Sequence, residues 1–167
     1  VNIGGEAGIG KSHLVRSFLD ELQGDNYHQL VLRCSAQHQG SPLYPVAVQL
    51  QAAFGITPQA GNADKLARLK PGLARLGLQA QALAPLALLV GVQPEVAAPA
   101  PADLRHEMLE ALAAIIAATA QSAPTPLLVE DLHWCDPSTM AFLEFLVQRA
   151  LPRRLLLVAT HRQEFVP

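Results

Sequence analysis

The chain is poor in cysteine and its histidines are scattered, which argues against a zinc-bound or disulfide-stabilised fold. Two of the 167 residues are cysteines, Cys34 and Cys135. They lack the paired spacing of a zinc site and the density of a disulfide framework, so we expect reduced thiols and a cytoplasmic location. The six histidines form no ligand cluster along the sequence. We interpret His133 as a structural or supporting residue rather than a metal ligand.

A surplus of basic residues and a long apolar run are also absent. Lysine and arginine total 12 against 14 acidic residues, so the composition predicts no direct nucleic-acid binding by this segment. No uninterrupted apolar stretch reaches the roughly twenty residues that a membrane helix needs. The run 83–92 is too short and contains Pro85. We interpret it as a buried helix and expect no membrane partner.

What the chain does contain is a glycine-rich segment near its start. Residues 5–12, GEAGIGKS, satisfy GxxxxGK[ST], the phosphate-binding loop. Glycines let the backbone wrap closely around a triphosphate, so that several N–H groups converge on it. We predict that Lys11 reaches the β- and γ-phosphates and that the Ser12 hydroxyl binds Mg²⁺. The predicted nucleotide-binding residues are Gly5, Gly8, Ile9, Gly10, Lys11, Ser12 and His13.

The residues on either side of this loop predict the strand and helix that a phosphate-binding loop requires. Residues 1–3 are typical of the end of a buried strand. From 11 to 22, the apolar residues Leu14, Val15, Phe18, Leu19 and Leu22 form one helical face. A dinucleotide-binding GxGxxG is excluded because His13 stands where its third glycine would be.

A second apolar run, 126–129, ends in the acids Glu130 and Asp131. It predicts a buried parallel strand that delivers carboxylates to the edge of the sheet where the phosphates lie. We assign Glu130 to Mg²⁺ and Asp131 to the attacking water. Taken alone, two acids after a strand also fit a turn or a helix cap.

A third run, 155–160, is followed by His161 and Arg162. It predicts a strand that places Thr160 and Arg162 at the same edge, where a guanidinium can pair with the γ-phosphate and report its presence. The alternative for Arg162 is a solvated side chain in a loop.

Between these runs the pattern is mainly helical, with a predicted strand at 29–33 and a helical insert at about 46–121. Leucines at 66, 69, 73 and 76 have helical spacing, but Pro71 and Gly72 predict a break. The proline- and alanine-rich stretch 93–102 predicts an exposed connection. Asp136 followed by Pro137 is a strong helix start, and that helix should bury Phe142, Leu143, Leu146 and Val147.

Together these segments resemble a known family, the signal-transduction ATPases with numerous domains, within the AAA-like class. The matching phrases are 5–14 (GEAGIGKSHL), 33–46 (RCSAQHQGSPLYPV), 130–139 (EDLHWCDPST) and 158–165 (VATHRQEF). The resemblance implies a three-layer α/β/α P-loop fold with a mainly parallel sheet in the strand order five, one, four, three, two. It is greatest to ATPase regions attached to bacterial class III nucleotidyl cyclases and to LuxR-type regulators. The implied ligands and partners are ATP, Mg²⁺, flanking signalling domains of the same polypeptide and nucleotide-dependent self-association.

The resemblance also predicts that residues 1–167 are one incomplete P-loop ATPase domain. The chain starts inside the first strand and stops just after Thr160 and Arg162, the candidate residues for sensing the γ-phosphate. We therefore expect the C-terminal part of the core to lie outside it, together with the fifth strand, the helical lid and any arginine finger. Asp131 stands where many AAA enzymes carry glutamate. We therefore expect slow hydrolysis, impaired further in this segment alone, with Lys11, Asp131 and Arg162 as the catalytic residues.

Three functions fit the sequence. The favoured one is an ATP-hydrolysing switch that sets the arrangement of flanking domains. The second is an ATP-binding interaction module that does not hydrolyse its nucleotide. The third is a P-loop kinase acting on a small acceptor, which the adjacent acids and the missing arginine-rich lid disfavour. A GTPase is disfavoured because no NKxD motif occurs.

Overall fold

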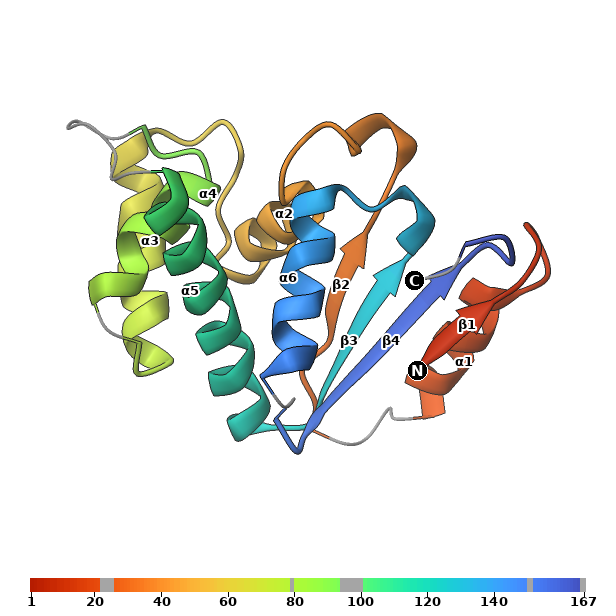
Figure 1. The fold of residues 1–167 in the computed structure, drawn as a ribbon. Coiled ribbons are helices and arrows are strands. Elements are labelled where there is room, and N and C mark those ends of the chain that lie inside the picture. The colour runs from red at the N-terminus through yellow and green to blue at the C-terminus, as the bar shows by residue number, and fades with distance from the viewer. Residues whose placement is uncertain (22–25, 79, 94–100, 150–151, 166–167) are drawn as a thin grey trace.

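The computed structural model describes residues 1–21, 26–78, 80–93, 101–149 and 152–165. Its centre is a four-stranded parallel sheet in the order β1-β4-β3-β2 (Figure 1). The strands are β1 (Asn2–Gly4), β2 (Leu30–Arg33), β3 (Thr125–Glu130) and β4 (Leu155–His161). The three-layer α/β/α class and the mainly parallel sheet predicted above are therefore confirmed.

The central strand β3 is apolar without alternation because both of its faces are covered. Leu127, Leu128 and Val129 are all nearly inaccessible to solvent. Leu128 faces one side of the sheet with Val158, its partner in β4, and both pack against Val15 and Leu19. Leu127 and Val129 belong to the larger core on the other side.

Helix α1 (Lys11–Glu21) covers the first face through a narrow stripe. Val15 and Leu19, one turn apart, are buried as predicted. Leu14 is 58% exposed, so its assignment to the buried face was wrong. One residue along a helix is a rotation of about 100°, which takes Leu14 off a stripe centred on Val15 and Leu19.

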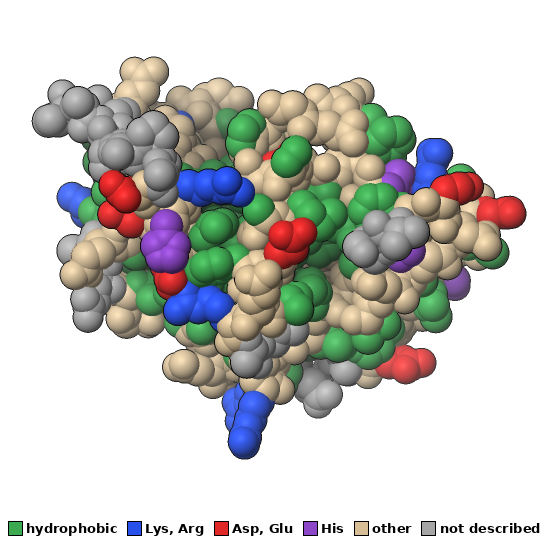
Figure 2. All heavy atoms as spheres, viewed as in Figure 1, with side chains coloured by type: hydrophobic (Ala, Val, Ile, Leu, Met, Phe, Trp, Pro, Cys, Tyr) green, Lys and Arg blue, Asp and Glu red, His purple; other side chains and the backbone are tan. Residues whose placement is uncertain are grey.

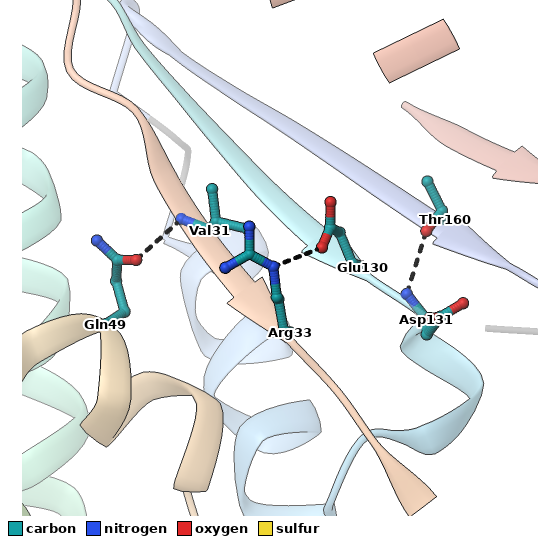
Figure 3. Close-up of polar contacts among 6 residues, drawn as sticks. All are labelled: Val31, Arg33, Gln49, Glu130, Asp131 and Thr160. Atoms are coloured by element: carbon teal, nitrogen blue, oxygen red, sulfur yellow. Dashed lines mark hydrogen bonds and ion pairs between the residues drawn. The ribbon is translucent and has the colours of Figure 1, made fainter. Parts of the chain in front are cut away.

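The opposite face is covered by α6 (Pro137–Gln148) and α2 (Tyr44–Ala53), with α5 (Pro101–Ser122) packed alongside α6. Phe142, Leu143 and Leu146 of α6 are buried as predicted, whereas Val147 is 55% exposed. Helix α2 also satisfies the sheet edge, since Gln49 Oε1 accepts a 3.2 Å hydrogen bond from the backbone N–H of Val31 (Figure 3). That bond occupies a donor that an edge strand would otherwise leave open.

The remaining helices gather at the β2 end of the molecule, away from α1 (Figure 1). They are α3 (Asn62–Arg75), the short η2 (Ala80–Ala82) and α4 (Leu83–Leu89), which pack with α5. The predicted break at Pro71 and Gly72 was wrong, because α3 continues through both residues. A proline inside a helix costs about 3 kcal/mol, and burial of Leu69 and Leu73 on either side of Pro71 offsets that cost.

Two short 3₁₀ turns, η1 (Ala36–His38) and η3 (Leu132–Trp134), follow β2 and β3. Most of the run 83–92 forms α4, which ends at Leu89 and contains the buried Pro85. Most of the predicted connection at 93–102 lies outside the described residues, and α5 begins at Pro101. In the described part of the chain, no helix combines the length and apolarity needed to cross a bilayer. Figure 2 shows acidic and basic side chains interspersed on the drawn face, without a large basic patch.

Candidate functional site

The loop between β1 and α1 has the backbone that its glycines predict. Gly8 and Gly10 adopt φ angles of 80° and 102°, in the region that side chains disfavour. The Gly5 N–H donates to the His161 carbonyl at 3.3 Å, which fixes the loop to the end of β4. At its other end the loop joins α1, where the Leu14 N–H donates to the Gly10 carbonyl at 2.9 Å. The loop therefore lies between a strand end and a helix N-terminus, where an anion is stabilised.

Lys11 projects back over this loop. Its Nζ donates to the carbonyl oxygens of Gly5 and Glu6, both at 2.8 Å. An ammonium group carries three donors, and these contacts place the positive charge above the backbone that would surround a phosphate.

The two acids at the end of β3 lie in different surroundings (Figure 3). Glu130, the last residue of β3, accepts a hydrogen bond at Oε2 from Arg33 Nε at 3.0 Å. The ion pair joins residues that are register partners in β3 and β2. Asp131 leaves the strand with φ 56° and ψ 49°, and its N–H donates to Thr160 Oγ1 at 3.1 Å. This left-handed turn redirects the chain toward η3.

A cavity of about 340 Å³ joins the three predicted segments. Its wall combines residues of the phosphate loop with residues that follow β3 and β4: Ala7, Gly8, Gly10, Lys11, Ser12, His13, Asp131, His133, Trp134 and Arg162. Lys11, Asp131 and Arg162, the three residues predicted to be catalytic, thus meet in one cavity. Gly5, Ile9 and Glu130 are not part of its wall, and the Ile9 side chain is 68% exposed.

Trp134 is a wall residue that the sequence analysis did not single out. It lies in η3, and the Arg162 guanidinium carbon is 5.6 Å from the centre of its ring. Only its position in the sequence could have indicated this role. Trp134 follows Asp131 closely, and residues directly after the end of β3 lie at the same edge of the sheet as the phosphate loop. Residue type did not distinguish a wall residue from a core tryptophan.

His133 is the second wall residue without an assigned binding role. Its Nδ1 is buried and, among the described residues, has no hydrogen-bond partner. Burial lowers the pKa of His133 below its ordinary value, the nearby Asp131 carboxylate opposes that change, and the charges of Arg162 and Lys11 lower the pKa further. The neutral imidazole is therefore favoured beside two cations.

The oxygen donors at this site suit Mg²⁺, a hard cation that prefers oxygen ligands. The Ser12 hydroxyl lines the cavity, and the Glu130 carboxylate lies at the end of the adjacent strand. In the described ranges, no group of three or more His, Cys, Asp or Glu side chains forms a metal site.

The arrangement combines backbone donors at a helix N-terminus, two cationic side chains and one carboxylate around the same cavity. The cations can bind a polyphosphate, and a carboxylate at the same cavity can orient a water molecule. The geometry therefore suits binding of a nucleoside triphosphate and attack on its terminal phosphate.

Comparison with known proteins identifies a matching family. The model of the AAA ATPase domain family matches residues 1–158. The chain is similar to an uncharacterized protein of Rhizobium meliloti (strain 1021), with 28% identity over 169 aligned positions. That alignment covers 99% of this chain and 16% of the relative, so the chain spans about a sixth of that protein's length. No solved structure matches significantly.

Proposed function

Because the chain belongs to the AAA ATPase domain family, we propose that it is the ATP-binding and ATP-hydrolysing switch of a larger signalling or transcription-regulating protein. One observation carries this proposal: the phosphate loop, Asp131 and Arg162 share a single cavity. A site that only held phosphate would need the loop alone. The added carboxylate and guanidinium provide a means to hydrolyse the terminal phosphate and to detect it.

Each predicted residue has a role in this function. The loop backbone from Gly5 to Gly10, followed by the first turn of α1, surrounds the phosphates, and Lys11 binds the β- and γ-phosphates. Ser12 and Glu130 hold Mg²⁺, which when bound neutralises charge on the phosphate oxygens. Asp131 orients water and accepts its proton, while Arg162 contacts the γ-phosphate. Thr160 fixes the Asp131 backbone through the 3.1 Å hydrogen bond.

The switch acts through the difference between ATP and ADP. A ligand shifts a conformational equilibrium only when it binds one state better than the other. The γ-phosphate supplies that difference here through Arg162 and Mg²⁺. The small fraction of the relative that aligns with this chain supports a module whose output lies in other domains. We propose flanking signalling domains as partners, nucleotide-dependent self-association and action in the cytoplasm.

Binding is tested by thermal unfolding with ATP and Mg²⁺. Ligand at about 100 times its dissociation constant stabilises by ~2.7 kcal/mol, which raises the melting temperature by about 5–10 °C for a domain of this size. Lys11→Ala should abolish the shift because the cation at the β- and γ-phosphates is lost. Lys70→Ala, at an exposed position of α3, is the matched control and should keep it. A full shift in Lys11→Ala would contradict the proposed site.

Hydrolysis is tested with Asp131→Asn. Removing the group that orients water should lower turnover by about a hundredfold or more while ATP binding persists. Asp64→Asn, an exposed acid in the first turn of α3, is the control.

The 3.0 Å Arg33–Glu130 ion pair favours a second candidate, an ATP-binding module without hydrolysis, because it occupies the acid assigned to Mg²⁺. Absence of turnover in the wild-type protein together with tight ATP binding would support that candidate instead.

A further inference from the structure

The side chain of Arg162 contacts an aromatic ring, whereas a typical structural arginine pairs with a carboxylate. Among the described residues it forms no ion pair. Its guanidinium carbon lies 5.6 Å from the centre of the Trp134 ring. Both side chains line the cavity that contains the phosphate loop. The arginine assigned to the γ-phosphate is thus restrained by an aromatic surface.

An aromatic partner leaves the hydrogen-bonding capacity of an arginine intact. A carboxylate takes up guanidinium N–H donors, whereas an indole ring attracts the charge of the group through its face. The donors at the edge of the plane stay free for a phosphate, which they match in geometry. Trp134 can therefore restrain Arg162 without competing with the nucleotide.

Hydrogen bonds hold the backbone of both Arg162 and Trp134 in place. The Arg162 carbonyl accepts hydrogen bonds from the Phe165 N–H at 3.1 Å and from the His161 ring at 2.8 Å. The His161 ring packs closely against Gly4, since a Cβ added at Gly4 would lie 2.9 Å from the ring. The backbone N–H of Trp134 donates to the Asp131 carbonyl at 2.8 Å. The Trp134 ring packs against the main core.

We propose that Trp134 is a positioning residue that holds the Arg162 guanidinium in the cavity and thereby increases the preference for ATP over ADP. The inference rests on the proposed function, because it requires that the cavity binds both nucleotides. Trp134 acts through Arg162 and not by touching the reacting atoms. Its removal frees a long side chain, which must then lose conformational freedom when the γ-phosphate binds.

The test measures dissociation constants for ADP and for the non-hydrolysable imido analogue of ATP, by competition with a fluorescent ADP analogue. Trp134→Leu should lower the preference for the ATP analogue by about two- to fivefold, with ADP affinity little changed. Trp134→Phe should retain most of the preference, because it keeps an aromatic face. In an Arg162→Ala background, Trp134→Leu should have no further effect, as expected for two residues that act through one contact.

Wild-type fluorescence gives a second measurement that does not depend on the folding of a variant. Trp134 is the sole tryptophan in these 167 residues, and Trp134→Phe serves as the blank. The ATP analogue should change the emission more than ADP does, because only the γ-phosphate binds the guanidinium that lies against the ring.

Four outcomes would count against the proposal in distinguishable ways. Identical emission with both nucleotides would overturn it. An unchanged preference in Trp134→Leu, or the same loss of preference with and without Arg162, would also overturn it and leave the proposed function standing. Failure of the wild-type protein to bind either nucleotide would refute the proposed function and this inference with it.

Discussion

Asp131 illustrates how a single residue can serve both the backbone and the cavity. Its left-handed conformation, with φ 56°, is one that aspartate tolerates better than most residues. The Thr160 hydroxyl accepts its N–H, which holds the turn in place. Because the same turn carries the carboxylate into the cavity wall, the backbone conformation determines where the candidate water-orienting group lies.

At the same scale, the two cysteines show what spacing along the chain does not reveal. They are separated by more than a hundred residues in the sequence, yet they are neighbours in the fold. The Cys135 thiol lowers the pKa of Cys34, while the Cys34 thiol and burial raise the pKa of Cys135. Each cysteine follows a strand or turn at the same end of the sheet, which brings them together.

His133 predicts an acid-dependent loss of stability. Because its pKa in the folded state lies below the ordinary value of 6.5, the unfolded chain takes up the proton first as the pH falls. The contribution of His133 is therefore complete above about pH 6.5 and is lost as the pH falls toward the lower folded pKa. The urea midpoint should fall between pH 7.5 and pH 5.5, and His133→Gln should reduce that fall.

The matched control is His28→Gln at an exposed histidine. It should keep the wild-type difference between the two pH values. An equal fall in the midpoint for wild type and His133→Gln would show that the histidine does not contribute.

At the level of elements, Asp136 joins the start of α6 to the start of α2. Its Oδ1 accepts from the N–H groups of Leu43, Ser138 and Thr139, each at 3.0 Å, and its Oδ2 accepts from Thr139 Oγ1 at 2.5 Å. The side chain is 2% exposed. The predicted capping role is thus confirmed, and the bond to Leu43 adds a second function that the local sequence does not show.

Asp136→Ala should lower the free energy of unfolding by about 2–4 kcal/mol. A lost cap costs about 1 kcal/mol, and a buried N–H left without an acceptor costs a further 1–3 kcal/mol. Asp136→Asn should cost less because one acceptor remains. Urea unfolding measures the change, with Glu144→Ala on the exposed side of α6 as control. A loss below about 0.5 kcal/mol, the range of ordinary surface substitutions, would contradict the role.

At the scale of the whole molecule, the helical insert and the sheet pack together through one hydrophobic core. The Phe54 ring, at the end of α2, occupies the space where a Cβ at Gly72 of α3 would lie. Leu69 and Leu73 flank this position and belong to the main core. The insert and the sheet therefore share one core, and Gly72 permits the close approach of α3 to Phe54.

Gly72→Ala should destabilise the protein by about 1–2 kcal/mol. Overpacking costs about 1–3 kcal/mol, and the better helix propensity of alanine recovers up to about 1 kcal/mol of that. Gly40→Ala is the control, because a Cβ there meets nothing within 4 Å. Calorimetric or urea unfolding that finds Gly72→Ala as stable as wild type would show that Phe54 moves aside freely.

The sequence by itself determined the parts of this protein that depend on neighbouring residues. The phosphate loop, the apolar strands and the cap at Asp136 are local patterns, because backbone freedom, burial on both faces and capping are decided within a few residues.

Tertiary structure alone decided which side chains meet. The fold placed the Arg162 guanidinium over the Trp134 ring and paired Glu130 with Arg33. It also kept α3 helical through Pro71. These outcomes depend on strand order and on burial against distant segments, which the local pattern does not encode. The phosphate loop, Asp131 and Arg162 were therefore predicted as cavity residues, whereas only the fold revealed Trp134 and His133 beside them.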